Sequence, residues 1–207
     1  MRQLHVPAFF HSPSSETRTS RQRSAFTLIE LLIVIAIIAI LAGLAFPAVQ
    51  GALNSGKKAQ ARNDVQQIAA AIRAYQLEYG RLPSSVTSPG DGDEDFLGKD
   101  RSKEVIAILT GENTSNLNPQ GRVFLEAKTT TSRKGGIDPS DKTFYDPWGE
   151  PYLIKLDTSY NNKLEYYSTG GAANPNVFSS VIVISTGPNK TQDDPNASGS
   201  DEIVSFK

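Results

Sequence analysis

The chain has 207 residues, with 21 Lys and Arg against 22 Asp and Glu, and its formal net charge is −1. A length of this order suggests one or two domains. The charge balance argues against a nucleic-acid-binding surface, which usually needs a clustered basic face. The chain has no cysteine, so a domain exported across a membrane would have to be stabilised by something other than disulfides.

The first segment, residues 1–25, is expected to be a leader. It carries four basic residues and one acidic residue: Arg2, Arg18, Arg21, Arg23 and Glu16. An excess of positive charge beside an apolar run favours the cytoplasmic side of a membrane. Without this leader the totals of 21 and 22 become 17 and 21, a net charge of −4. The two histidines, His5 and His11, also lie in the leader, so the remaining chain lacks His and Cys for a nucleophilic triad or a zinc site.

A long apolar run follows the leader. After Phe26-Thr27-Leu28-Ile29-Glu30, no charged residue occurs until Lys57. An apolar stretch of about 18 or more residues is typical of a membrane-spanning helix. A carboxylate near the start of such a helix is costly in lipid, so Glu30 is a candidate functional residue.

Three other interpretations of this run compete. A secretory signal has an apolar core of about 7–15 residues and then a small-x-small cleavage site, which Gly43-Leu44-Ala45 would supply. However, Leu31–Ala45 already reaches the upper limit of that length. A plain single-pass anchor explains the length but not Ala25-Phe26 or the carboxylate. A buried core helix is disfavoured because the segment is apolar on all faces and opens the chain.

An amphipathic helix is predicted to continue the apolar run. Apolar residues recur at three- and four-residue spacing, which is one stripe of a helix: Ala61, Val65, Ile68, Ile72, Tyr75 and Tyr79. Gly80 and Pro83 would end it. One helix from Phe26 to Tyr79 would be about 80 Å long, with residues 26–50 in the membrane and 51–80 packed on a head. Pro47 predicts a gentle kink.

The remainder is predicted to hold a variable loop and helix region, 81–145, and a β-sheet head, 146–207. In the first region we expect a loop at Ser84–Asp95, a helix from about Ser102 to Thr110, a strand at Arg122–Ala127 and a polar loop at Lys128–Ser140. In the second we expect strands at Tyr152–Leu156, Lys163–Tyr167, Phe178–Ser185 and Asp201–Phe206. The predicted fold class is α+β, with a small antiparallel sheet packed on the long helix.

Two further motifs lie in the head. Asp146–Tyr152 contains two prolines and a glycine, which predict a stiff turn, and Trp148 is expected to cover the seam between helix and sheet. The C-terminal polar loop offers oxygens that suit a hard cation, and a solvated acidic loop is the other interpretation. The candidate ligands are Asn189, Asp193, Asp194, Asp201 and Glu202.

The start of the chain resembles the cleavage and methylation site of type IV prepilins and pseudopilins. The resemblance implies that a dedicated peptidase cuts between Ala25 and Phe26, that Phe26 is N-methylated, and that Glu30 acts in assembly. The family usually has Gly before the cut, where this chain has Ala25. Pilin-like proteins also have a proline at the position of Pro47, and that region can unwind in filaments.

Two later segments resemble the major pseudopilins of type II secretion systems. Asp146–Tyr152 matches an Asp-Pro-Trp-Gly-x-Pro-Tyr motif. A calcium-binding loop of that branch is matched at Ser185, Gly187, Asn189 and Asp201-Glu202-Ile203, and the chain departs from it at Asn189, commonly Asp, and at Lys190, usually Gly. The segment 84–144 is longer than is usual in that branch.

The resemblance implies a pilin-like fold and a structural protein, not an enzyme. The chain would be a subunit of a periplasmic pseudopilus that drives type II secretion, stored in the inner membrane with its leader cytoplasmic and its head periplasmic. The implied partners are copies of itself, minor pseudopilins, a prepilin peptidase and methyltransferase, and an inner-membrane assembly platform, with Ca²⁺ as cofactor and no nucleic acid.

Two other functions remain open from the sequence. The first is a subunit of a type IV pilus or a DNA-uptake filament, for which storage and assembly would be the same. The second is a binding or enzymatic head on a membrane anchor. Against the enzyme, the sequence shows no Gly-rich phosphate loop after a strand, and no carboxylate pair is identified as acid and base.

Overall fold

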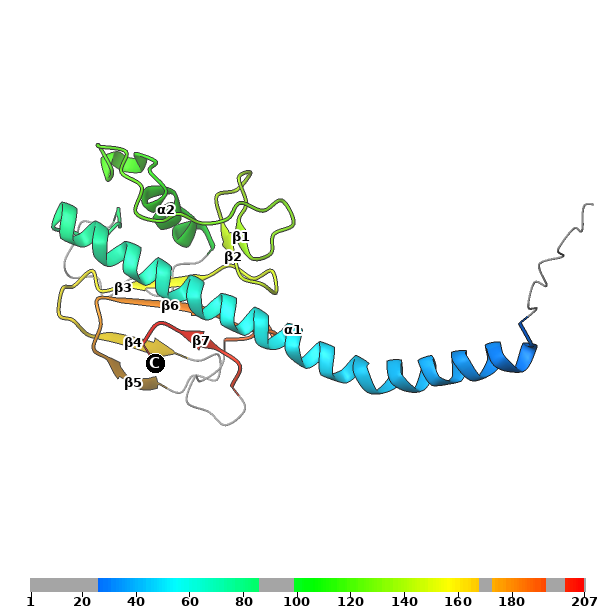
Figure 1. Ribbon diagram of the computed structural model, residues 1–207. Helices are drawn as coiled ribbons and strands as arrows, with labels where there is room; N and C mark the ends of the chain where they lie inside the picture. The colour runs from blue at the N-terminus through cyan, green and yellow to red at the C-terminus, as the bar shows by residue number, and fades with distance from the viewer. Residues whose placement is uncertain (1–25, 86–98, 168–172, 193–199, 207) are drawn as a thin grey trace, which may run out of the picture. The chain divides into compact units, whose positions relative to one another are not determined.

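The computed structural model describes residues 26–85, 99–167, 173–192 and 200–206. Contacts divide the chain into two compact units, residues 1–47 and 48–207. The helices are α1 (Leu28–Tyr79), α2 (Lys99–Leu109) and a 3₁₀ turn (Thr114–Asn116). The strands are β1 (Gly136–Ile137), β2 (Phe144–Tyr145), β3 (Leu153–Leu156), β4 (Leu164–Tyr167), β5 (Ala173–Val177), β6 (Val181–Ser185) and β7 (Ile203–Val204) (Figure 1).

The predicted long helix is confirmed by α1, which has 52 residues and runs without a break through Pro47. It ends where the sequence predicts. Gly80 has a φ of +67°, and its N–H donates to the carbonyl of Gln76 at 2.9 Å. A residue in this left-handed conformation is the usual stop of an α-helix, and glycine adopts it at the least cost.

The predicted antiparallel sheet is also confirmed. Its strand order is β3-β6-β7, with Ile154 opposite Val183 and Ile184 opposite Val204. Two hairpins, β1-β2 and β4-β5, accompany it. Strands β3, β4, β6 and β7 fall within four predicted strand segments, and α2 overlaps the predicted helix but begins three residues earlier.

Two hydrophobic clusters lie on opposite faces of this sheet. Alternate residues of a strand point to opposite faces, and both faces of β6 are buried. On one face, Val181 and Val183 join the apolar stripe of α1 and buried residues of α2. On the other face, Ile182 and Ile184 pack with Leu164 of β4 and with β7. The stripe predicted from the sequence is therefore the core of the head, because five of its six members are fully buried and Tyr79 is partly buried.

Three predictions for the region between helix and sheet need correction. No strand forms at Arg122–Ala127, because the N–H groups of Phe124 and Leu125 donate to the carbonyl of Leu109 at 2.8 and 3.0 Å instead of to a neighbouring strand. The predicted loop at Lys128–Ser140 contains β1, and β5 was not predicted at all. Most of the loop predicted at Ser84–Asp95 lies outside the described residues.

Candidate functional site

The first turn of α1 is built around Glu30. The backbone N–H and the hydroxyl of Thr27 both donate to Glu30 Oε2, at 2.9 and 2.8 Å. In return the Glu30 N–H donates to Thr27 Oγ1 at 3.3 Å. Phe26 precedes this turn and its side chain is 83% exposed. Ala25, the other residue of the predicted cleavage site, lies outside the described residues.

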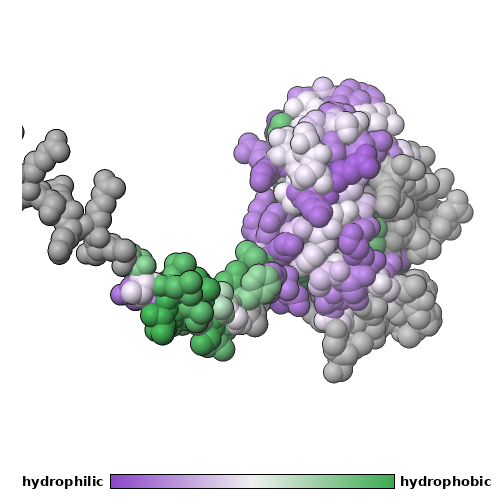
Figure 2. Space-filling model, turned by 90° about the vertical axis from the view of Figure 1, so that its right-hand side faces the viewer, coloured by the Kyte–Doolittle hydropathy of each residue, from purple (hydrophilic) through white to green (hydrophobic). Residues whose placement is uncertain are grey.

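The part of α1 that follows Glu30 presents apolar side chains to its surroundings. Large hydrophobic residues from Leu31 to Leu53 are exposed, and Figure 2 shows hydrophobic surface along this part of the helix. By length and composition, α1 is the one helix among the described residues that could cross a membrane. Apolar exposure on this scale marks a membrane or protein interaction surface. Pro47, the other predicted assembly residue, lies inside this stretch.

The turn before β3 is organised by the carboxylate of Asp146. Its Oδ1 accepts the N–H groups of Trp148, Gly149 and Glu150 at 2.8–2.9 Å. Its Oδ2 accepts the hydroxyl of Ser185 at 2.7 Å. Burial raises the pKa of Asp146 above its usual value, and these four hydrogen bonds oppose part of that rise. The stiff turn predicted from the prolines and glycine is therefore present, and half-buried Trp148 packs against the main core cluster as expected.

The same turn is tied to α1 through Tyr152. The hydroxyl of Tyr152 donates to Asp64 Oδ2 at 2.9 Å, although the residue itself is 1% exposed. Burial is the main cause of the rise in the pKa of Tyr152, and the negative charge of Asp64 adds to it. The phenol consequently stays protonated at any physiological pH and serves as a hydrogen-bond donor, not as an acid.

The predicted cation loop lies between β6 and β7. The N–H of Asn189 donates to Asp201 Oδ2 at 3.0 Å, which brings these two predicted ligands together. The Asn189 Oδ1 accepts the N–H of Thr191 at 2.8 Å. Glu202, directly before β7, is buried. Asp193 and Asp194 lie outside the described residues.

Polar atoms in this loop fit a hard cation. Thr186 Oγ1 and Asp201 Oδ1 are buried without a hydrogen-bond partner among the described residues. Buried polar atoms normally have a partner, so these oxygens match a site for an additional ligand. The described residues contain no group of three or more His, Cys, Asp or Glu side chains that could hold a metal. Calcium would therefore need neutral oxygens as well, which it accepts readily.

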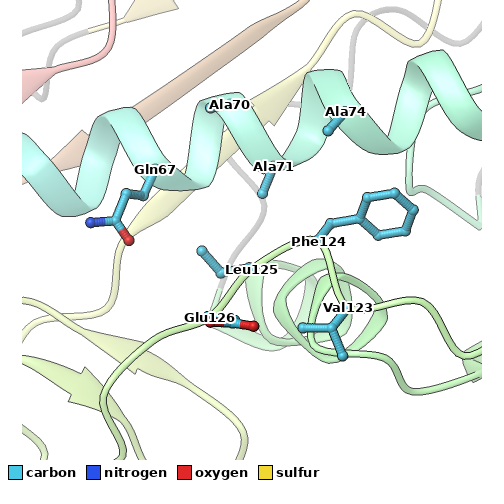
Figure 3. A pocket seen from close by; sticks show the side chains of 8 residues that line it. All are labelled: Gln67, Ala70, Ala71, Ala74, Val123, Phe124, Leu125 and Glu126. Atoms are coloured by element: carbon cyan, nitrogen blue, oxygen red, sulfur yellow. The ribbon is translucent and has the colours of Figure 1, made fainter.

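A groove of about 580 Å³ lies between α1 and the extended segment after α2. Figure 3 shows its lining: Gln67, Ala70, Ala71 and Ala74 from α1, and Val123, Phe124, Leu125 and Glu126 from the segment. Glu126 is the ionisable side chain in this set. The groove therefore offers one titratable side chain for acid–base chemistry.

Two contacts in these regions are not among the sequence predictions. Thr27 was not singled out, although Thr-x-x-Glu is a recognisable capping pattern. Asp146 and Ser185 are 39 positions apart in the sequence, so no local pattern predicts their hydrogen bond.

A long helix that joins an exposed apolar half to an amphipathic half packed on a small antiparallel sheet defines a pilin-like protein. A family model for the prokaryotic N-terminal methylation motif matches residues 20–46. The type II secretion system core protein G of Pseudomonas aeruginosa is 30% identical over 150 residues, which cover 72% of this chain and 84% of that protein. The chain belongs to the family of the type II secretion system core protein G.

Other relatives include a second core protein G and a type IV pilin. The core protein G of Aeromonas hydrophila is 26% identical over the same shares of the two chains, 72% and 84%. The type IV major pilin protein PilE1 of Neisseria gonorrhoeae is 32% identical over 99 residues, but these cover 48% of this chain and 55% of that pilin. No solved structure matches the chain.

Proposed function

We propose that the chain is the structural subunit of a pseudopilus that drives type II protein secretion. The observation that carries this proposal is the single helix α1, whose first part exposes apolar side chains and whose second part forms the core of the head. The first part suits storage in a lipid bilayer and later packing against copies of itself. Membership of the core protein G family supports secretion as the task of the filament.

In this proposal the chain is made as a precursor and cut between Ala25 and Phe26. The new amine of Phe26 is methylated, as the matching methylation motif suggests. The leader stays cytoplasmic because of its basic residues, and the head faces the periplasm. The subunit is held in the inner membrane until an assembly platform adds it to the filament with minor pseudopilins.

Glu30 is the residue that assembly uses. It lies four residues after Phe26, about 6 Å along a helix axis. A carboxylate buried among apolar helices needs a partner, and the methylated amine of Phe26 in a neighbouring copy supplies the cation. Before assembly, the two bonds from Thr27 satisfy the same carboxylate oxygen within one chain.

We also propose that the loop between β6 and β7 holds one Ca²⁺. Asn189, Asp201 and Glu202 would be its ligands, with Asp193 or Asp194 as a further carboxylate. The ion would stabilise the head by binding the folded state alone. It would have no catalytic role, because the chain is proposed to be a structural protein.

A type IV pilus subunit is the second candidate, favoured by the similarity to a gonococcal major pilin. Deleting the gene in its host separates the two. If the chain serves secretion, the culture medium should lose its secreted enzymes, and the gene restored on a plasmid should recover them. Unchanged secretion with loss of surface filaments would contradict the secretion function and support the pilus.

A further inference from the structure

Asp146 and Ser185 form a buried pair between two separate parts of the head. Asp146 lies in the turn before β3, and Ser185 is the last residue of β6. Both residues are 0% exposed, and their side-chain oxygens are 2.7 Å apart. Oδ1 of Asp146 already accepts three N–H groups of the turn. The other oxygen, Oδ2, is therefore the one that accepts the hydroxyl of Ser185.

The contact continues from Ser185 into the loop that follows. The oxygen of Ser185 also accepts the N–H of Gly187 at 3.2 Å. Gly187 has a φ of +72°, and a Cβ on it would lie 2.5 Å from the carbonyl oxygen of Asp201. Gly187 therefore brings the loop segment after β6 into backbone contact with the segment before β7, an approach that a larger residue would prevent.

The hydrogen bond from Gly187 to Ser185 depends on where the hydroxyl proton of Ser185 points. A hydroxyl has one proton and rotates to suit its partners. Donation to a carboxylate is a strong, charge-assisted bond, so Asp146 fixes the proton and leaves a lone pair of Ser185 for the N–H of Gly187. The two segments joined in this way carry Asn189 and Asp201, whose own contact is 3.0 Å long.

We propose that Asp146 and Ser185 are positioning residues of the cation loop, which hold its two segments at the separation that lets Asn189 and Asp201 bind one divalent ion. The inference rests on the calcium site proposed above. Neither residue needs to touch the ion. The buried oxygens of Thr186 and Asp201, which lack a hydrogen-bond partner among the described residues, lie on the two segments that the pair joins.

Calcium titration of the full-length chain tests the pair. The protein is purified in detergent, stripped with chelator and titrated with CaCl₂ in a calorimeter. Ser185→Ala removes the hydroxyl. Asp146→Asn keeps the oxygen that holds the turn but replaces the acceptor for Ser185 with a donor. Ser159→Ala is the matched control, because the hydroxyl of Ser159 donates to Asp157 Oδ1 at 3.0 Å in the turn after β3.

We expect the unmodified chain and Ser159→Ala to bind one Ca²⁺ with the same Kd. Both variants of the pair should bind about tenfold more weakly, as expected for residues that position metal ligands. A merely structural pair would lower the Tm in chelator and leave the Kd unchanged, and that result would overturn the inference. A lack of calcium binding by the unmodified chain would overturn the proposed cation site and the role of the pair with it.

Discussion

Thr27 and Glu30 bind each other in both directions at the start of α1. The Thr27 N–H reaches the Glu30 carboxylate at 2.9 Å, and the Glu30 N–H reaches the Thr27 hydroxyl at 3.3 Å. This reciprocal arrangement is a capping box, which satisfies two of the donors that a helix leaves unpaired at its start. The carboxylate therefore has partners in its own chain before it meets another subunit.

Replacing Glu30 with valine should leave cleavage intact and block polymerisation. Removing one member of a buried ion pair costs about 3–5 kcal/mol, which predicts a loss of filament yield well beyond tenfold. Sheared filaments quantified by immunoblot measure this yield, and Ile29→Val is the control for a change in the same exposed apolar segment. Normal yield from Glu30→Val would contradict the proposed role of the carboxylate.

Replacing Lys190 with glycine should stabilise the head. Lys190 has a φ of +61°, a conformation that costs an L-residue about 1–2 kcal/mol and glycine almost nothing. The change also removes the exposed ion pair with Glu150 at 3.2 Å, worth about 0–1 kcal/mol. We therefore expect a net gain of about 1 kcal/mol, or about 2–4 °C in Tm.

The fluorescence of Trp148, the single tryptophan of the chain, reports this unfolding. Lys190→Ala is the control, because it loses the ion pair and keeps the unfavourable backbone conformation. Its Tm should equal that of the unmodified chain or fall slightly below it. A glycine variant that melts no higher than the alanine variant would show that the backbone at this position is not strained.

Replacing Asn118 with leucine should destabilise the head strongly. Asn118 is 0% exposed and its amide donates to the carbonyls of Ile108 and Arg122 at 2.9 and 2.8 Å. Its oxygen accepts the N–H of Arg122 at 3.0 Å and the hydroxyl of Tyr79 at 2.7 Å. Leucine would leave the buried carbonyl of Ile108 and the part-buried groups of Arg122 and Tyr79 without these bonds, at a cost of about 2–4 kcal/mol.

Denaturant unfolding measures the cost of Asn118→Leu. Tyr79→Phe removes one of the four bonds and should cost about 1 kcal/mol. If the leucine variant is as stable as the phenylalanine variant, Asn118 is not the residue that fixes α2 and the segment at 122–127 to α1.

Removing calcium should lower the Tm of the head. The full-length chain in detergent should melt higher in millimolar CaCl₂ than in chelator, because an ion bound to the folded state alone stabilises it. Asp201→Ala should abolish that difference. Asp141→Ala, a carboxylate change outside the loop, should preserve it. Equal Tm values in calcium and chelator for the unmodified chain would leave a solvated acidic loop as the correct interpretation.

The parts of this fold that depend on local pattern were predictable. The stripe from Ala61 to Tyr79 and the stop at Gly80 follow from helical spacing and backbone preference, and β6 follows from its β-branched residues. The segment Arg122–Ala127 was mispredicted because its backbone bonds to Leu109 at the end of α2. A β-prone sequence does not reveal which acceptor it will find.

The residues of the candidate sites are likewise predictable from the sequence only where they belong to a local pattern. Phe26 and Glu30 are recognisable in the sequence because they lie where the basic segment 1–25 meets the long apolar run. The cation loop that we propose between β6 and β7 is indicated by its acidic and amide residues, but the contacts of Asp146 with Ser185 and of Asn189 with Asp201 are tertiary. The spacing of these residues in the sequence follows neither a helical nor a strand period, so no sequence pattern predicts that they meet.

The most direct test of the proposed pseudopilin function is the intact mass of the protein extracted from membranes of cells that express the prepilin peptidase. We expect a chain that begins at Phe26, has lost residues 1–25, and carries one added methyl group on its amine. Fragmentation of the N-terminal peptide locates that group. A precursor that remains uncut, or a chain cut after Ala45, would contradict the prepilin origin on which the filament function depends.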